Sequence, residues 1–129
     1  MAKIKILIAE DDKDTLELYQ KGLTENLFEV RFAINGKEAL DLYQEWRPDI
    51  IVLDIVMPVM TGYSVLKEIR EKMKDRISKI VMATSLSTKH DIIDCSKLGI
   101  EGYIIKPFQY TEIGSILINY LKQASPQQA

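Results

Sequence analysis

The chain has 129 residues, of which 47% are apolar, and its formal net charge is −2 at pH 7. A chain of this length builds one hydrophobic core without disulfides or structural metals, and its single cysteine, Cys95, fits a reducing, cytoplasmic compartment. The slightly acidic balance excludes the basic surface of a nucleic-acid-binding domain, and no apolar run is long enough for a secretory signal or a membrane span.

Apolar, β-branched runs recur at fairly even distances along the chain. They predict strands over Ile4–Ala9, Phe28–Ala33, Asp49–Leu53, Lys79–Ala83 and Gly102–Ile105. The third and fourth runs are almost continuously apolar, which is typical of strands covered on both faces. After each strand, apolar residues repeat at helical spacing. Before the fourth helix, Thr88 and Asp91 resemble a capping box.

Five successive strand–helix pairs predict an α/β fold, a doubly wound parallel sheet with helices on both faces. We expect a single domain over residues 1–123, followed by a polar tail over residues 124–129.

Polar residues stand where the predicted strands end. They are Glu10-Asp11-Asp12 after the first strand, Asp54 after the third, Thr84-Ser85 after the fourth and Lys106-Pro107 after the fifth. Doubly wound folds bind ligands at the carboxyl ends of their strands. If the first and third strands are neighbours, Asp11 and Asp54 converge, and carboxylates about 5 Å apart repel by roughly 3 kcal/mol at an effective dielectric of about 20. The repulsion implies a bound cation, and ligation by oxygen alone favours Mg²⁺ over Zn²⁺.

The same strand ends bring further groups to the predicted cation site. Lys106 would add a positive charge and Thr84 a hydroxyl donor, and such a set stabilises an incoming phosphoryl group. Asp54 is therefore predicted to be a nucleophile whose carboxylate becomes an acyl phosphate.

These motifs, in this order, resemble the receiver domain of two-component response regulators, the CheY-like family. The resemblance covers Lys3 to about Lys122 and rests on Glu10-Asp11, Asp54 to Gly62 with Met57-Pro58 between them, Thr84, and Lys106-Pro107-Phe108. It implies a flavodoxin-like (βα)5 fold with the strand order 2-1-3-4-5.

The resemblance also implies the roles of individual residues. Asp54 would accept a phosphoryl group from a sensor histidine kinase or a histidine phosphotransfer protein, with Lys106 and Thr84 contacting the phosphoryl oxygens. Glu10, Asp11, Asp54 and the main-chain carbonyl of Val56 would hold Mg²⁺. Tyr103 matches the family's switch aromatic, and Lys106-Pro107 matches its cis peptide.

Phosphorylation would then change the face formed by the fourth helix, fifth strand and fifth helix, where Ile93 and Ile118 are candidate contacts for an output partner. Leu18, on the first helix, is a candidate contact for the kinase. We expect a signalling switch rather than an enzyme, one that catalyses its own phosphotransfer and slow autodephosphorylation. It would be a monomer or a phosphorylation-dependent dimer. It would make no direct contact with nucleic acid or membrane.

Three residues depart from the family pattern. Ser85 stands where a small Ala or Gly is usual, and Val56 and Leu86 are apolar where relatives are often polar. Neither apolar side chain can orient an attacking water, so the sequence predicts a long-lived phosphoryl form. Away from the site we expect Asp12 at a helix N-terminus, His90 on the surface and Cys95 in the core.

Other functions remain as alternatives. A haloacid-dehalogenase-like phosphatase also uses an aspartate nucleophile, but it needs a second aspartate where this chain has Val56. A flavodoxin-type nucleotide module wants a phosphate loop after the first strand, where three acids would repel phosphate. A receiver that never takes phosphate would not be expected to keep every site residue. The chain could also be a receiver module cut from a larger response regulator or hybrid kinase.

Overall fold

The computed structural model describes residues 2–123, apart from the side chains of residues 86 and 87. The predicted tail over residues 124–129 therefore lies outside the described residues. The strands are β1 (Ile4–Ala9), β2 (Phe28–Ala33), β3 (Ile50–Asp54), β4 (Lys79–Ser85) and β5 (Gly102–Lys106). The α-helices are α1 (Lys13–Gly22), α2 (Gly36–Trp46), α3 (Gly62–Lys67), α4 (Ile92–Leu98) and α5 (Tyr110–Lys122). A π-helical turn, η1 (Glu68–Lys72), continues α3, and a 3₁₀ helix, η2 (Leu86–Asp91), precedes α4.

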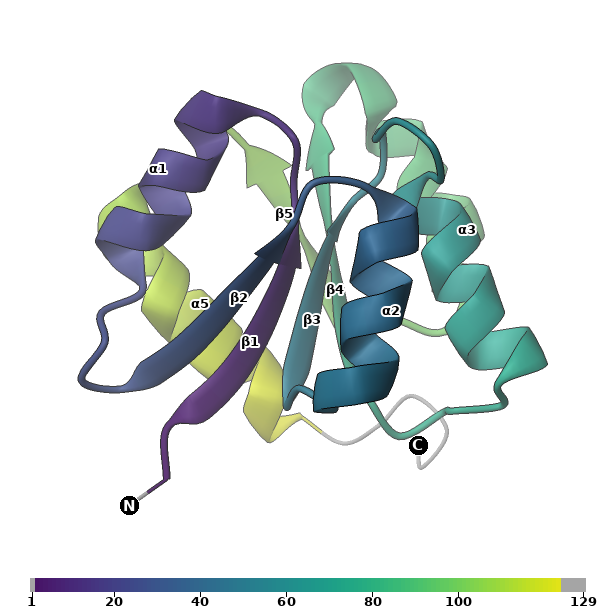
Figure 1. Cartoon of the computed structure of the whole chain (residues 1–129). Coiled ribbons are helices and arrows are strands. Elements are labelled where there is room, and N and C mark those ends of the chain that lie inside the picture. The colour runs from purple at the N-terminus through teal and green to yellow at the C-terminus, as the bar shows by residue number, and fades with distance from the viewer. Residues whose placement is uncertain (1, 124–129) are drawn as a thin grey trace.

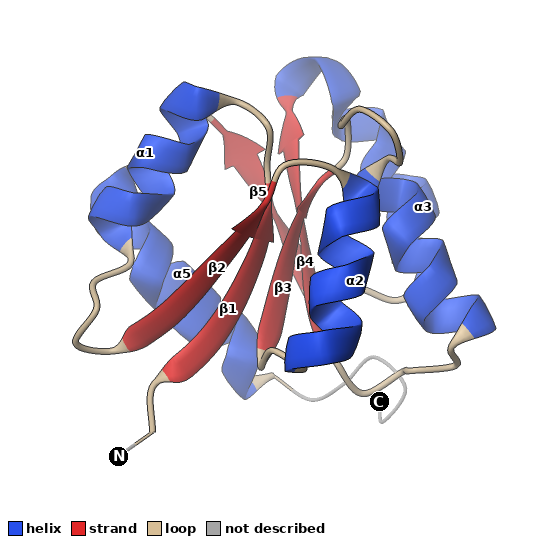
Figure 2. Ribbon diagram, viewed as in Figure 1, coloured by secondary structure: helices blue, strands red, loops and turns tan. Residues whose placement is uncertain are grey.

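The strands form one parallel sheet in the order β2-β1-β3-β4-β5. Helices α1 and α5 cover one face of this sheet, while α2, α3 and α4 cover the other (Figures 1 and 2). The prediction of a doubly wound sheet with this strand order is confirmed. In the described part of the chain, no helix is long and apolar enough to cross a bilayer.

Two apolar clusters lie on the two faces of the sheet, because successive strand residues point to opposite faces. Ile6 of β1 packs with Tyr19 of α1 and Leu117 of α5. Leu7, the next residue, belongs to the cluster that contains Leu66 of α3 and, as expected, a buried Cys95. Every residue of β3 is buried. The central strand is thus a rigid platform for the residues at its carboxyl end.

Three strands run further than the sequence predicts. The acid Asp54 is the last residue of β3, β4 continues through Ser85, and β5 continues through Lys106. The pairing of neighbouring strands explains the difference, because Asp54 lies opposite Ala83 and Thr84 opposite Ile105 in the parallel ladders. Asp54, Thr84 and Lys106 are therefore held within strands of the sheet and not in loops.

The predicted capping box before the fourth helix is wrong. Ser85 occupies the N-cap of η2, with Thr88 at its third position, and α4 begins only at Ile92. The Ser85 N–H donates to the Thr88 hydroxyl at 3.2 Å, and the two hydroxyl oxygens are also 3.2 Å apart. The box therefore starts three residues earlier than predicted, because the hydroxyl at the end of β4 takes the capping role.

Candidate functional site

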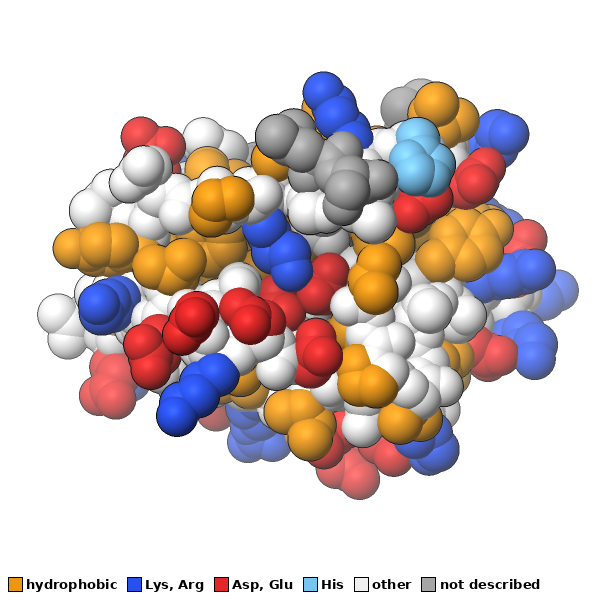
Figure 3. All heavy atoms as spheres, turned by 90° about the horizontal axis from the view of Figure 1, so that it is seen from above, with side chains coloured by type: hydrophobic (Ala, Val, Ile, Leu, Met, Phe, Trp, Pro, Cys, Tyr) orange, Lys and Arg blue, Asp and Glu red, His pale blue; other side chains and the backbone are white. Residues whose placement is uncertain are grey.

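Three carboxylates meet at the carboxyl edge of the sheet. Glu10 and Asp11 directly follow β1, and Asp54 ends β3, the neighbour of β1. One carboxylate oxygen from each residue lies within 4.8 Å of those of the other two. Glu10 and Asp54 are buried, whereas Asp11 is exposed. Seen from above, acidic side chains gather around a basic one at this edge (Figure 3).

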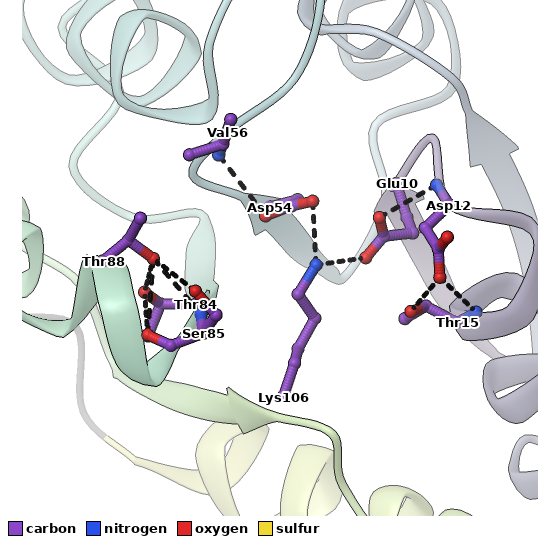
Figure 4. Close-up of polar contacts among 9 residues, drawn as sticks. All are labelled: Glu10, Asp12, Thr15, Asp54, Val56, Thr84, Ser85, Thr88 and Lys106. Carbon is purple, nitrogen blue, oxygen red and sulfur yellow. Dashed lines mark hydrogen bonds and ion pairs between the residues drawn. The ribbon is translucent and has the colours of Figure 1, made fainter.

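The basic group is Lys106, which reaches the acids from the end of β5. Its Nζ donates to Glu10 Oε1 and to Asp54 Oδ2, each at 2.9 Å (Figure 4). The peptide bond between Lys106 and Pro107 is cis. The ammonium lies between two carboxylates that come from strands distant in the sequence.

Burial and pairing set the charge of these groups. Burial raises the pKa of Glu10 to about 7, although the hydrogen bond from Lys106 opposes the shift. Burial disfavours the charged form of Lys106, but its hydrogen bonds to Asp54 and Glu10 outweigh burial and raise its pKa. One ammonium thus pairs with two of the three carboxylates, and Asp11 leaves the site with surplus negative charge.

The loop after Asp54 is shaped by a glycine. The N–H of Gly62 donates to the carbonyl oxygen of Ile55 at 3.0 Å. A Cβ on Gly62 would lie 2.0 Å from the carbonyl oxygen of Asp54, so no larger residue fits without displacing the backbone. The loop turns back on itself, and the Val56 N–H points to Asp54 Oδ1 at 3.4 Å. The predicted role of the Val56 carbonyl as a metal ligand stays a prediction.

Thr84, the last residue but one of β4, is fully buried and lies beside Thr88, apart from the carboxylates (Figure 4). Its hydroxyl lies 2.6 Å from that of Thr88 and also donates to the Ser85 carbonyl at 3.1 Å (Figure 4). Sequence reasoning gave Thr88 no part in the site. The signal that could have found it is the Ser85-x-x-Thr88 spacing, which is typical of a hydroxyl-capped helix start.

Asp12 plays the structural role expected of it. It is the N-cap of α1, and its Oδ2 accepts from the Thr15 N–H at 3.0 Å and from the Thr15 hydroxyl at 2.7 Å (Figure 4). Those hydrogen bonds lower the pKa of Asp12. The Asp12 N–H in turn donates to Glu10 Oε2 at 3.1 Å. The helix start thereby fixes the orientation of the acid beside it.

The predicted switch and docking residues lie outside this cluster. Tyr103 of β5 is 40% exposed and Ile93 of α4 is 65% exposed, whereas Ile118 and Leu18 are partly buried. The imidazole of His90 is exposed, as expected. Leu86, predicted to flank the phosphoryl group, has its side chain outside the described residues.

Comparison with known proteins decides the family. Residues 6–118 match the family model of the response regulator receiver domain. The chain belongs to this family. The receiver domain is 28% identical to the chemotaxis response regulator CheY4 of Vibrio cholerae, with a TM-score of 0.82 over 92% of this chain and 99% of that one.

Two relatives of the receiver domain are named as regulators of transcription. It is 38% identical over 109 residues to the transcriptional regulatory protein PrrA of Mycobacterium leprae, covering 84% of this chain and 46% of that protein. It is 37% identical over 111 residues to the probable transcriptional regulator ycf27 of Guillardia theta, covering 86% of this chain and 42% of that protein. The chain thus spans about half the length of the curated relatives it matches.

The chemistry of the site follows from its donors. Its ligand atoms are all carboxylate oxygens, which suit a hard divalent cation such as Mg²⁺. The surplus negative charge favours the same ligand, since a cation would offset the repulsion. The Lys106 ammonium, which already pairs with Asp54, can also pair with an anion that is brought next to Asp54. The site can therefore hold a hard cation beside Asp54 and offer an ammonium to an anion there.

Proposed function

We propose that this receiver domain is a phosphorylation-activated switch with Asp54 as its phosphoacceptor. A carboxylate oxygen of Asp54 attacks the phosphorus of a phosphohistidine on a sensor kinase or phosphotransfer protein. The P–N bond breaks, its electron pair and a proton remain with the imidazole, and an acyl phosphate forms on Asp54. The supporting observation is the placement of a buried Asp54 against Lys106 and two further acids. On this proposal the domain takes up one phosphoryl group. It catalyses its own phosphotransfer and slow autodephosphorylation and no other reaction.

Glu10, Asp11 and Asp54, with the main-chain carbonyl of Val56, are proposed to hold Mg²⁺. Bound there, the ion would supply positive charge to the phosphoryl oxygens. Lys106 has the complementary role of keeping Asp54 oriented and of pairing with an incoming phosphoryl oxygen.

The proposed switch begins with the hydroxyl of Thr84. A phosphoryl group adds about −1.5 to −2 charge and strong acceptor oxygens, which attract this hydroxyl. To reach them, Thr84 must leave Thr88, and Thr88 also caps the start of η2. We propose that the change passes to α4, to Tyr103 and to α5, and alters their affinity for a protein partner.

The partners and setting follow from the same proposal. Leu18 is proposed to contact the kinase or phosphotransfer protein, and Ile93 with Ile118 to contact the output partner. The domain is proposed to span residues 1–123, to work in the cytoplasm and to be a monomer or a phosphorylation-dependent dimer. It would have no direct contact with nucleic acid. PrrA and ycf27 are named as regulators of transcription. We therefore also propose that, if the domain is part of a longer protein, its output partner is a DNA-binding domain.

The phosphoryl form is proposed to be long-lived. The side chain of Val56 is 59% exposed beside Asp54 and has no polar atom to orient a water molecule. Val56→Asn is expected to speed phosphate release from the phosphorylated, Mg²⁺-loaded domain. An unchanged release time course would count against this part of the proposal.

The central experiment is incubation with Mg²⁺ and acetyl phosphate, followed by intact-mass measurement. One added phosphoryl group is expected on the native domain and none on Asp54→Ala. Omission of Mg²⁺ is expected to abolish the addition as well. A mass increase that persists in Asp54→Ala would overturn the assignment, and steady release of phosphate from many monoesters would favour a phosphatase.

A further inference from the structure

A small hollow lies beside the loop that follows Asp54, the proposed phosphoacceptor. It has a volume of about 300 Å³ and separates the loop after β3 from the start of α4. One side is formed by Ile55, Val56, Thr61 and Tyr63, and the other by the carboxylates Asp91 and Asp94. We call this hollow the α4 pocket.

The side of the α4 pocket next to the sheet is largely apolar and firmly held. Ile55 is buried at the end of the central strand, and Tyr63 packs against the core cluster under α3. Val56, by contrast, presents an apolar side chain that is 59% exposed. A ligand that covers Val56 would gain from removing this surface from water, at about 25 cal/mol per Å².

Among the described residues, the two carboxylates on the other side of the pocket form ion pairs with side chains that are largely exposed. Asp91 stands at the N-cap of α4 but makes no side-chain capping bond. Its carboxylate faces His90 at 3.3 Å, and Asp94 faces Lys97 at 3.8 Å. Ion pairs between such exposed residues contribute little, typically about 0 to 1 kcal/mol. Both carboxylates can therefore exchange these neighbours for a ligand.

We propose that the α4 pocket binds an arginine side chain of a partner protein. The methylene stem of an arginine would cover Val56, and its guanidinium would bridge Asp91 and Asp94 with charge-assisted hydrogen bonds. The two acids lie three residues apart, which places them on the same side of the helix. The Tyr63 ring offers a face on which a guanidinium can stack.

The lining of the pocket favours arginine over other side chains. A lysine ammonium is a compact charge that cannot bond two carboxylates through a planar fork, and it is more strongly hydrated. A purely apolar side chain would displace water from the two carboxylates without giving them a hydrogen bond or a positive charge in return. A free small cation would lose the contact of a stem with Val56.

The position of the pocket connects it to the switch, and this part rests on the proposed function. One wall, Val56, donates its N–H to Asp54, the proposed phosphoacceptor. The opposite wall, Asp91, is the last residue of η2, the 3₁₀ helix whose start Thr88 caps. Thr88 would lose its hydrogen bond to Thr84 when Thr84 turns to the phosphoryl group. Movement of η2 would change the separation of the two walls, so phosphorylation is expected to change arginine affinity.

The test uses three short peptides and amide chemical shifts of the ¹⁵N-labelled chain. The peptides are Ac-Gly-Arg-Gly-amide and its lysine and norleucine counterparts. The arginine peptide is expected to give saturable shifts confined to residues around Val56, Tyr63, Asp91 and Asp94. The lysine peptide is expected to bind at least about threefold more weakly, and norleucine not measurably.

Two double variants distinguish binding in the α4 pocket from a general attraction of the cationic peptide to an acidic protein. Asp91→Asn with Asp94→Asn is expected to weaken arginine binding about fivefold or more. Asp14→Asn with Glu17→Gln removes the same charge from two exposed acids on α1 and is expected to leave binding unchanged. Equal weakening by both pairs, or binding of norleucine or lysine as tight as that of arginine, would overturn the proposal.

A final arm distinguishes this proposal from the proposed function. The titration is repeated after Mg²⁺ and acetyl phosphate, with Asp54→Ala as control. A change in arginine affinity in the native chain alone supports the connection with phosphorylation, and an unchanged affinity in a chain shown by mass to be phosphorylated refutes it. If no phosphoryl group is added, the proposed function fails, while saturable arginine binding still supports the pocket.

Discussion

The two ends of the sheet both bury charged side chains, but they use them in opposite ways. At the carboxyl edge, Lys106 pairs with Glu10 and Asp54, and Asp11 adds a third carboxylate close by. At the amino edge, the side chains of Arg70 in η1 and of Glu101, which precedes β5, are completely buried, and Arg70 Nη2 lies 3.5 Å from Glu101 Oε1. The amino edge pairs its buried charges one to one, and the carboxyl edge does not.

Hydrogen bonds at the amino edge tie loops together. Arg70 Nε donates to the Gly99 carbonyl at 2.8 Å and Nη1 to the Asp75 carbonyl at 3.0 Å. Glu101 Oε1 accepts from the Ile80 N–H at 2.6 Å. The Asp75 carboxylate accepts from Tyr43, Ile77 and Ser78. This polar cluster fixes the segments that enter β4 and β5.

The contrast indicates which buried charges serve stability and which serve function. At the amino edge the Arg70 charge is offset by the Glu101 charge, so that pair carries no surplus charge for a ligand to offset. The carboxyl edge keeps unbalanced negative charge, at a cost in stability that a bound cation can offset. The predictions below test this difference from the largest expected effect to the smallest.

Arg70→Met is expected to destabilise the domain by about 3 to 5 kcal/mol, because it leaves the Glu101 carboxylate buried without its cation. Equilibrium unfolding in urea measures the loss. The double variant Arg70→Met with Glu101→Leu should recover a large part of it, since neither charge is then buried. A loss below about 1 kcal/mol in the single variant would mean that the pair is not a buried unit.

The hydrogen bonds of Asp75 make stability depend on acid pH. Burial opposes its charge, but the bonds from Ser78 and Tyr43 outweigh burial and lower its pKa to about 2. Because the folded-state pKa lies below the unfolded value, the stabilisation is fully present above about pH 4 and is lost as the pH falls towards 2. With partial exposure discounted, we expect about 1 to 2 kcal/mol.

Urea unfolding at several pH values, compared with Asp75→Asn, isolates this contribution. The difference in unfolding free energy between the two proteins should shrink as the pH falls from 4 to 2. A difference that stays constant over this range would exclude Asp75 as its source.

Val59→Gly, in the loop after β3, is expected to stabilise the domain by about 1 kcal/mol. Val59 is β-branched, 80% exposed and held at φ 69°, a conformation that glycine adopts without strain. Lys74→Gly, at φ 55° near the amino edge, is the matched control and should gain less because lysine is unbranched. Thermal unfolding of both variants checks the order, and a larger gain at Lys74 would contradict it.

Asp11→Asn is expected to stabilise the Mg²⁺-free domain by about 0.5 kcal/mol, because it removes an exposed charge within 4.8 Å of two other acids. Asp14→Asn, in the first turn of α1, should instead be slightly destabilising, since an acid suits a helix N-terminus. Added Mg²⁺ should stabilise Asp11→Asn less than the native domain. Equal Mg²⁺ stabilisation in both would remove Asp11 from the proposed ligands.

The strands and the acidic edge could be predicted from the sequence by itself. Apolar runs report which segments are buried, and the order of the elements then places the strand ends, with Glu10, Asp11, Asp54 and Lys106, at one edge. Those inferences need only the order of the elements along the chain and the spacing of the apolar residues. The strand ends were misplaced by one or two residues, because pairing with neighbouring strands and not local composition decides where a ladder stops.

Only the tertiary structure decided which polar groups become partners. Arg70, on an amphipathic stretch, could have been a solvated side chain, yet it is buried against Gly99 and Glu101. Thr84 faces Thr88, and the loop after Asp54 meets α4 to enclose a pocket. The physical reason is that burial follows from a residue's own character, whereas a hydrogen-bond partner depends on which distant loops the fold brings within about 3 Å.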